Sequence, residues 1–118
     1  ALPFDDGTLT MAVGRATLHH LPDKALSLTE MYRVLAPGGI ALVHDMRRDA
    51  PQHLLDRFTE MRAAADYPPT HVEEKITLDE AHALVAAAGL ADVASIYSPS
   101  AGLGALGFEI LLKKPALA

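Results

Sequence analysis

The chain has 118 residues, half of them hydrophobic and 21% charged, a composition that excludes a disordered polymer and predicts one globular domain with a modest core. Ten basic residues stand against fifteen acidic ones, and no basic cluster exceeds two residues, so nucleic acid is not an expected partner. Cysteine is absent and no apolar run approaches the ~20 residues of a membrane span, which predicts a cytoplasmic protein without disulfides or a membrane anchor.

The first third of the chain predicts a strand followed by a helix. Residues 8–13, "TLTMAV", mix β-branched and apolar residues between two glycines and predict a strand. Over residues 24–35 apolar side chains recur at spacings of three and four, which predicts a helix with Asp23 as its N-cap. Pro37 cannot continue a helix and Gly38 can adopt the left-handed cap, so the helix is expected to end there.

The middle of the chain predicts a second strand and two further helices. Residues 40–45, "IALVHD", are almost continuously apolar, as in a parallel strand covered on both faces. A helix is expected to open at Asp49 and Pro51, with proline at its first position. Thr77-x-x-Glu80 is a capping-box pattern, which predicts a third helix that ends at Gly89.

The C-terminal segments predict two antiparallel strands. Residues 91–98, "ADVASIYS", and 106–115, "LGFEILLKKP", are apolar and β-branched, and a short loop separates them. The order strand, helix, strand, helix, helix, strand, strand therefore predicts an α/β sheet with a right-handed parallel crossover and an antiparallel C-terminal hairpin.

Residues 102–107 spell G-x-G-x-x-G, the pattern of a dinucleotide-binding loop. That site needs a preceding strand, a following helix and an acidic residue about 20 positions later. Only eleven residues follow Gly107, and "FEILLKK" is strand-like, so we interpret the glycines as a hairpin loop.

Four segments occur in a characteristic order: "LPFDDGTLTMAV", "LHHLPD", "EMYRVLAPGGIALVHDM" and "ITLDEAHALVAAAGLADV", followed by a closing strand "GFEILLKKP". In this order and spacing they resemble class I S-adenosylmethionine-dependent methyltransferases of the small-molecule type. The resemblance implies a partial Rossmann-like sheet, the equivalents of strands four to seven. Where the family usually has Phe-Asp at the start of strand four, this chain has Leu9 and Thr10, which removes a buried acceptor that often organises the neighbouring loops.

The resemblance also implies what is missing. The family binds S-adenosylmethionine with a Gly-rich turn, a ribose-holding acid and an adenine-contacting pair, all in its N-terminal half, and none is found here. We therefore expect residues 1–118 to be a single partial domain, the C-terminal half of the fold, with the cofactor bound in the complete protein. Three hypotheses stay open: a fragment of a methyltransferase, a half-domain completed by a partner, and a folded remnant with a structural role.

Ligands in open α/β sheets bind beyond the carboxyl ends of the strands. By the resemblance, Arg15, Ala16 and Leu18 line the methionine end of the cofactor, and His19 and His20 face the donor methyl group or a small-molecule acceptor. His20 is a candidate general base, because imidazole titrates near neutrality, or alternatively caps the next helix.

Two residues after the second strand complete the candidate site. Asp45 binds substrate or caps the following turn. Arg47, with Arg48, recognises an acidic substrate or is a solvated surface pair. The six histidines follow no metal-ligand spacing, so no metal site is expected. Since the first strand would lack its neighbour, we expect a homodimer formed through the exposed sheet edge.

Overall fold

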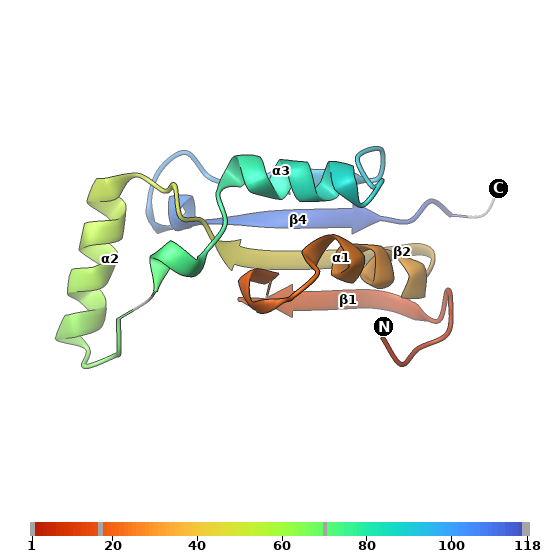
Figure 1. The fold of residues 1–118 in the computed structure, drawn as a ribbon, viewed down its shortest axis with the longest axis horizontal. Helices are drawn as coiled ribbons and strands as arrows, with labels where there is room; N and C mark the ends of the chain where they lie inside the picture. The colour runs from red at the N-terminus through yellow and green to blue at the C-terminus, as the bar shows by residue number, and fades with distance from the viewer. Residues whose placement is uncertain (1, 17, 70, 117–118) are drawn as a thin grey trace.

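The computed structural model describes residues 2–16, 18–69 and 71–116, and it is built on a single four-stranded sheet (Figure 1). In chain order the strands and helices are β1 (Leu9–Arg15), α1 (Lys24–Val34), β2 (Leu35–Met46), α2 (Gln52–Ala64), α3 (Leu78–Ala87), β3 (Ala94–Tyr97) and β4 (Gly107–Lys113). Three short 3-10 turns lie at Leu18–His20, Val72–Glu74 and Leu103–Leu106.

The strand order is β1-β2-β4-β3, which leaves β1 and β3 at the two edges of the sheet. β1 and β2 are parallel and joined by the crossover through α1. β4 is antiparallel to both β2 and β3. The α/β class, the parallel crossover and the antiparallel C-terminal hairpin are thus confirmed.

Helix α1 begins as the sequence predicts but ends earlier. The Asp23 carboxylate accepts a hydrogen bond of 2.9 Å from the Leu26 N–H, as an N-cap does. The helix stops at Val34, one turn before Gly38, so the prediction that Pro37 and Gly38 form its end is wrong. Proline disfavours helical backbone at the residue before it, and β2 already starts at Leu35; Gly38 instead turns the backbone within β2 with φ +81°.

The other two helices follow the predicted pattern with one shift. Pro51 is the N-cap of α2 rather than its first helical residue. At α3 the capping box is complete, because the Thr77 side chain accepts from the Glu80 N–H while the Glu80 carboxylate accepts from the Thr77 N–H. Among the described residues, no helix combines the length and apolar character needed to cross a membrane.

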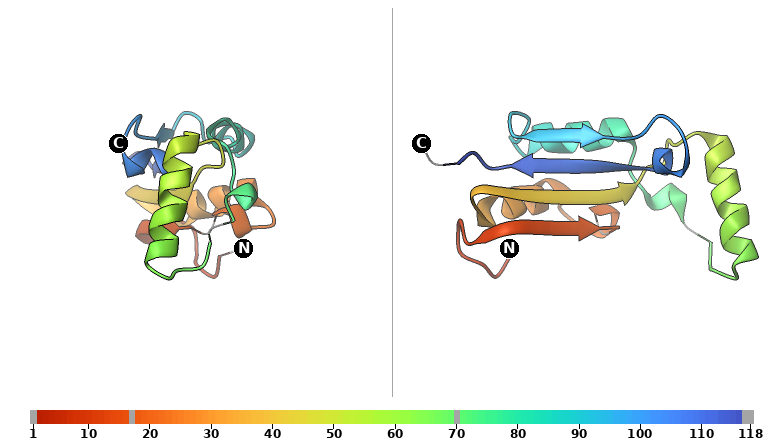
Figure 2. Two further views of the ribbon diagram at one scale, coloured as in Figure 1. Left: turned by 90° about the vertical axis from the view of Figure 1, so that its left-hand side faces the viewer. Right: turned by 180° about the vertical axis from the view of Figure 1, so that it is seen from behind.

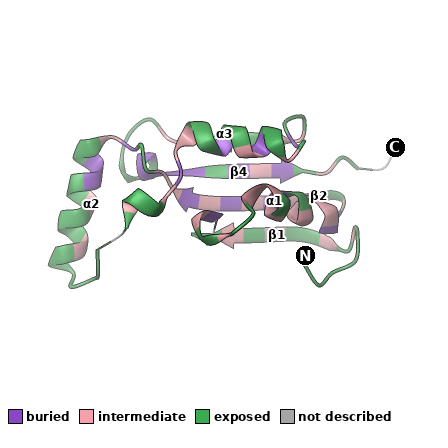
Figure 3. Ribbon diagram, in the orientation of Figure 1, coloured by how far each residue is buried: buried purple, intermediate pink, exposed green. Residues whose placement is uncertain are grey.

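Helices cover one face of the sheet only. Figure 2 shows α1 and α3 behind the strands in the view from the back, and the near face carries no helix. The prediction that β2 is covered on both faces is therefore wrong: its alternate residues Ala41, Val43 and Asp45 are buried, whereas Leu42 and His44 are only half-buried (Figure 3). The core between sheet and helices contains twelve buried residues: Leu18, Leu28, Leu35, Ala41, Val43, Ile76, Ala81, Val85, Leu90, Phe108, Ile110 and Leu112.

Helix α2 stands apart from this layer, across the end of the sheet (Figures 1 and 2). It packs with the turn Leu103–Leu106 in a separate small cluster of buried residues, Ala50, Leu54, Leu55, Ala105 and Leu106. The G-x-G-x-x-G segment forms this turn and leads straight into β4, with no helix after it, so its interpretation as a hairpin loop is confirmed.

Candidate functional site

The loops that follow β1 and β2 lie side by side, because the two strands are parallel and end at the same edge of the sheet. The Ala16 N–H donates to the His44 carbonyl at 2.7 Å and extends the ladder one residue past β1. Ala16 itself has φ +56°, a left-handed conformation that turns the chain sharply out of the strand. This geometry brings the residues around His19 next to those around Asp45.

Asp45 and His19 form the buried centre of the site. The His19 Nδ1 atom lies 2.7 Å from the Asp45 Oδ2 atom, and the two side chains are 2% and 0% exposed. The carboxylate also accepts from the backbone N–H of His19 at 3.0 Å and from that of Met46 at 2.8 Å. A buried carboxylate needs such donors, and here they fix the loop after β1 onto the end of β2.

Lys75 completes this network from a distant part of the chain. Its Nζ atom lies 2.9 Å from the His19 Nε2 atom. A lysine ammonium group can only donate and a carboxylate can only accept, so His19 carries its proton on Nδ1 and accepts at Nε2. The resulting chain Asp45–His19–Lys75 joins three segments and occupies both nitrogens of the His19 ring.

The other residues of the first loop differ in accessibility. His20 is exposed and its ring packs against that of His19, with centroids 3.8 Å apart and planes tilted by 45°. Ala16 is also exposed. The Leu18 side chain is 1% exposed and belongs to the core, so only its backbone can contact a cofactor.

Neither candidate substrate-binding residue at the C-terminal end of β2, Asp45 or Arg47, presents a free charged group. The Asp45 carboxylate is enclosed, as described, and resembles a cap more than a substrate contact. The Arg47 guanidinium binds both carboxylate oxygens of Asp49, at 2.9 and 3.1 Å, and the Ser98 hydroxyl at 3.1 Å. This pairing lowers the pKa of Asp49 and raises that of Arg47. Arg48 binds Glu80 and the Lys75 carbonyl.

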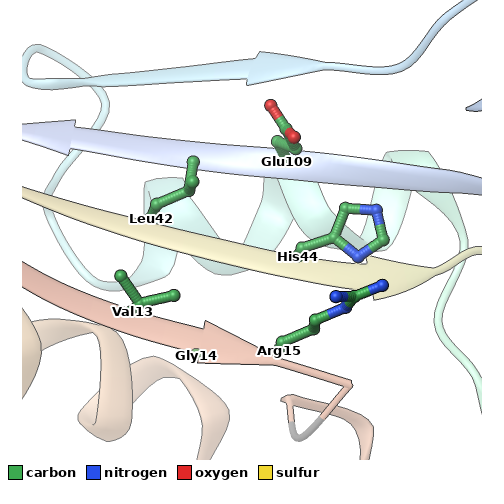
Figure 4. Close-up of a pocket in the computed structure, with 6 residues that line it drawn as sticks. All are labelled: Val13, Gly14, Arg15, Leu42, His44 and Glu109. Atoms are coloured by element: carbon green, nitrogen blue, oxygen red, sulfur yellow. The ribbon is translucent and has the colours of Figure 1, made fainter.

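A hollow of about 310 Å³ lies on the uncovered face of the sheet, beside the same strand ends. Figure 4 shows Arg15 next to His44 from adjacent strands, with Glu109 on the strand beyond. The His44 ring lies against the backbone of β4: a Cβ atom at Gly107 would come within 3.3 Å of its Nε2 atom and 2.7 Å of the Asp45 carbonyl oxygen. Among the described residues, neither Arg15 nor Glu109 forms an ion pair.

These residues enclose no complete site for S-adenosylmethionine. S-adenosylmethionine carries ribose hydroxyls, which need an acidic acceptor, yet Asp45, the carboxylate at this strand end, already accepts three hydrogen bonds and is enclosed. Arg15 and Ala16 are accessible, but the hollow beside them is an open depression in the sheet face. The described chain therefore does not fit the whole cofactor. In the same residues, no group of three or more His, Asp or Glu side chains is placed to hold a metal ion.

Sequence reasoning finds the strand-end residues and misses Lys75 and Glu109. Lys75 lies in the link between α2 and α3, where no periodicity or motif marks it. Glu109 interrupts the apolar run of β4, and a charged residue between hydrophobic neighbours is the feature of the sequence that could have marked it as a candidate. Its place beside His44 follows from the antiparallel register, which the sequence does not reveal.

Comparisons with known proteins find sequence similarity to methyltransferases. Residues 1–43, which include β1, α1 and most of β2, match the model of the methyltransferase domain family. A demethylmenaquinone methyltransferase of Lactiplantibacillus plantarum is 54% identical over 37 residues, which cover 31% of this chain and 16% of that protein. The ubiquinone/menaquinone biosynthesis C-methyltransferase UbiE of Enterobacter sp. is 31% identical over 121 aligned positions, which cover 90% of this chain and 48% of that protein.

The fold is also similar to those of solved methyltransferase structures. A S-adenosylmethionine-dependent methyltransferase from Thermotoga maritima superposes with a TM-score of 0.65 at 18% identity, over 97% of this chain and 60% of that one. At this identity the likeness establishes the Rossmann-like fold alone. The chain spans about half the length, or less, of the two sequence relatives it matches.

Proposed function

We propose that this chain, which is related to the class I S-adenosylmethionine-dependent methyltransferases, contributes the C-terminal half of an enzyme that methylates a small-molecule acceptor. The observation that carries the proposal is the coincidence of two matches. The family model matches residues 1–43, which include β1 and the loop after it with His19 and His20, and 97% of the chain superposes on a methyltransferase fold. The names of both sequence relatives refer to quinones, which supports a small-molecule acceptor over a macromolecular one.

In this enzyme the residues after β1 have separate tasks. Arg15 and Ala16 line the methionine end of the cofactor, together with the backbone of Leu18. His20, which is exposed, accepts a proton from the acceptor. His19 holds the His20 ring in place through the contact between the two tilted rings and is itself held by Asp45 and Lys75. The bound cofactor supplies the methyl group.

The partial-domain hypothesis is tested with a chimera. The segment of the Enterobacter protein that precedes its match is fused to residue 1, and S-adenosylhomocysteine binding is measured by calorimetry for the chimera and for the 118-residue chain. We expect micromolar binding by the chimera only. A folded chimera that binds nothing would contradict the proposal, and micromolar binding by the 118-residue chain would show that its own residues suffice.

The role of His20 is tested in the same chimera. His20→Asn removes the proton acceptor and is expected to lower kcat by about 10²-fold or more, with unchanged affinity for S-adenosylhomocysteine. His53→Asn, at an exposed position of α2, is the matched control. Equal activity of the two variants would exclude His20 as the base.

A second candidate function is self-association as a non-catalytic half-domain, and the free edge of β1 favours it. Met11 and Val13 on this strand are 53% and 62% exposed. Beside the strand, an apolar groove of about 530 Å³ runs between the N-terminal segment and α1, where Phe4 and Leu26 are also exposed. An unpaired apolar edge is a template for pairing with a second copy, so we propose a homodimer through β1.

The edge homodimer has a specific test, because the outward N–H groups of β1 can be identified. The Ala16 N–H donates to β2, and N–H groups alternate along a strand, so that of Val13 points to the free edge. Val13→Pro removes this N–H group but no hydrogen bond between β1 and β2. The substitution is therefore expected to abolish the dimer, as measured by sedimentation equilibrium. Val13→Ala keeps the N–H and is expected to retain the dimer; equal effects of the two variants would contradict pairing through β1.

A further inference from the structure

Lys75 lies in the link between α2 and α3, yet its backbone is held against the end of β2. The Arg48 guanidinium donates to the Lys75 carbonyl at 3.1 Å, and the Arg48 N–H donates to the Ile76 carbonyl at 2.9 Å. Arg47 and Ile76 form a single parallel bridge, and the Ile76 side chain is buried in the main core. The backbone therefore presents the Lys75 side chain at a fixed place, as a residue that supports a site requires.

The Lys75 side chain reaches a histidine from this place. Its Nζ atom lies 2.9 Å from the His19 Nε2 atom, in a half-buried contact between residues 56 positions apart. Two exposed carboxylates, Glu73 and Glu74, directly precede Lys75, yet among the ion pairs of the described residues neither binds its ammonium group. Since an ammonium group is strongly hydrated and its stem is mobile, holding it on a neutral nitrogen costs solvation and side-chain freedom.

Both nitrogens of the His19 ring are occupied as a result. The Asp45 carboxylate accepts from Nδ1 at 2.7 Å, Lys75 donates to Nε2, and the His19 side chain is only 2% exposed. A general base needs a nitrogen within hydrogen-bond reach of the proton that it accepts. His19 therefore cannot serve as that base, whereas its neighbour His20 is exposed and lies against the His19 ring.

We propose that Lys75 is the positioning residue that assigns proton transfer to His20. By occupying Nε2 it withdraws His19 from reaction with a substrate and fixes that ring as the support against which His20 lies. This inference rests on the proposed function and deepens it, because the sequence placed both histidines near the donor methyl group. The link between α2 and α3 thereby takes part in the site at the strand ends.

Nitrogen-15 NMR of the 118-residue chain tests the contact without cofactor or acceptor. Lys75→Met keeps the length of the stem and removes the donor. We expect the His19 Nε2 resonance to move to lower field, as an imidazole nitrogen does when it loses a hydrogen-bond donor, while Asp45 keeps Nδ1 protonated. Lys24→Met is the matched control, because the Lys24 ammonium group binds the Leu21 carbonyl instead. An unshifted Nε2 resonance in Lys75→Met would overturn the proposal.

Chemical modification of the same chain shows which histidine is available. Diethyl pyrocarbonate acylates accessible neutral imidazole nitrogens, and mass spectrometry of peptides locates the product. In the wild type we expect modification of His20 but not of His19, and in Lys75→Ala, which uncovers Nε2, modification of both. Lys75→Arg supplies another donor and is expected to restore the protection of His19. Equal modification of the two histidines in the wild type would contradict the assignment.

The chimera described above measures the consequence for methyl transfer, with a short-chain quinol as the probe acceptor. Lys75→Ala is expected to lower kcat by about tenfold or more at unchanged KM for S-adenosylmethionine, because a displaced base costs rate and not cofactor binding. Lys75→Arg is expected to recover most of kcat. An unchanged kcat in Lys75→Ala would overturn the positioning role. An inactive wild-type chimera would instead contradict the proposed function, and the two measurements on the 118-residue chain would still decide the role of Lys75.

Discussion

Asp45 shows how much a single residue can organise in this site. Its carboxylate is fully buried and accepts three hydrogen bonds, two of them from the backbone on either side of the strand-end crevice. The side chain thereby fixes the loop after β1, and the tautomer of His19, from the end of β2. We therefore interpret Asp45 as a residue that positions the site.

Asp45→Asn tests this interpretation. The amide keeps the shape but replaces one acceptor oxygen with a donor, which faces the N–H groups of His19 or Met46. We expect a loss of about 2 kcal/mol in the free energy of unfolding by urea. Asp92→Asn, at an exposed site, is the control, and an equal loss there would contradict the assignment.

The contact between Glu30 and Arg33 is expected to be lost in acid. The Arg33 guanidinium, with the Leu2 N–H, holds the pKa of Glu30 at about 2, below its usual 4.5. Because the pKa is lower in the folded chain, the contribution of this contact is complete above pH 4.5 and is lost as the pH falls toward 2. The N-terminal segment should then detach from α1.

A carbon-detected NMR titration of the Glu30 carboxyl group checks this prediction. The midpoint is expected near pH 2 in the wild type, and Arg33→Gln should move it back toward 4.5. A wild-type midpoint already near 4.5 would show that the ion pair does not form in solution.

The burial of Asp45 and the contact of Lys75 with His19 could not be predicted from the sequence. The strand-end rule located Arg15, His20 and Asp45, because it depends only on where strands stop. It could not show that Asp45 faces inward, since burial of a carboxylate depends on donors contributed by other segments. Lys75 lies 56 positions from its partner His19, and no local pattern encodes such a contact.

At the scale of elements, two adjacent glycines in β2 are needed for different reasons. Gly38 has φ +81° and open space around its Cα, so it is required for its backbone conformation. A Cβ atom at Gly39 would lie 2.8 Å from the Ala36 carbonyl oxygen and 3.1 Å from that of Thr10. Gly39 is thus required because β1 passes too close for a side chain.

The two alanine substitutions should therefore differ in cost. Gly38→Ala is expected to destabilise the chain by about 1 kcal/mol, the strain of a left-handed alanine. Gly39→Ala is expected to cost about 2 kcal/mol, because backbone atoms of two segments must move apart. Urea unfolding of both variants measures the difference, and the opposite order would contradict this division of roles.

The same segment explains why the sequence placed the end of α1 wrongly. The Pro-Gly-Gly pattern is a common helix stop, and it predicted a cap at Gly38. In the structure the backbone leaves the helix at Leu35, before the proline; Gly38 then turns the backbone within β2, and Gly39 lets β1 pass close to it. The starts of the helices were easier to predict, because the Asp23 cap and the Thr77 capping box are hydrogen bonds between residues three positions apart in the sequence.

At the scale of the whole molecule, the chain is a slab of two layers. Its radius of gyration is 15.6 Å, against about 13.5 Å for a compact domain of this length. The sequence predicted the α/β class correctly, since that depends on the order of elements. It could not show that one sheet face is bare, because Leu42 and Leu111 are as apolar as residues that helices do cover.

A chain that leaves apolar surface uncovered should gain stability from assembly. Binding that favours the folded state raises the melting temperature with protein concentration. We therefore expect the Tm measured by calorimetry to rise by several degrees over about a hundredfold increase in concentration. The Val13→Pro variant, impaired at the free edge of β1, should show a constant Tm, and a concentration-independent wild-type Tm would contradict the proposed edge homodimer.

Helix α2 and its small cluster at the end of the sheet have a consequence for how the chain opens. Because Leu54 and Leu55 pack against the turn before β4 and not against the main core, α2 can detach while the sheet stays intact. Such a unit has its own opening equilibrium, with faster amide hydrogen exchange than the strands. A protease should accordingly cut first at Arg57 or Arg62, and this helix is where the chain can accept an insertion or a replaced sequence at the smallest cost to the rest.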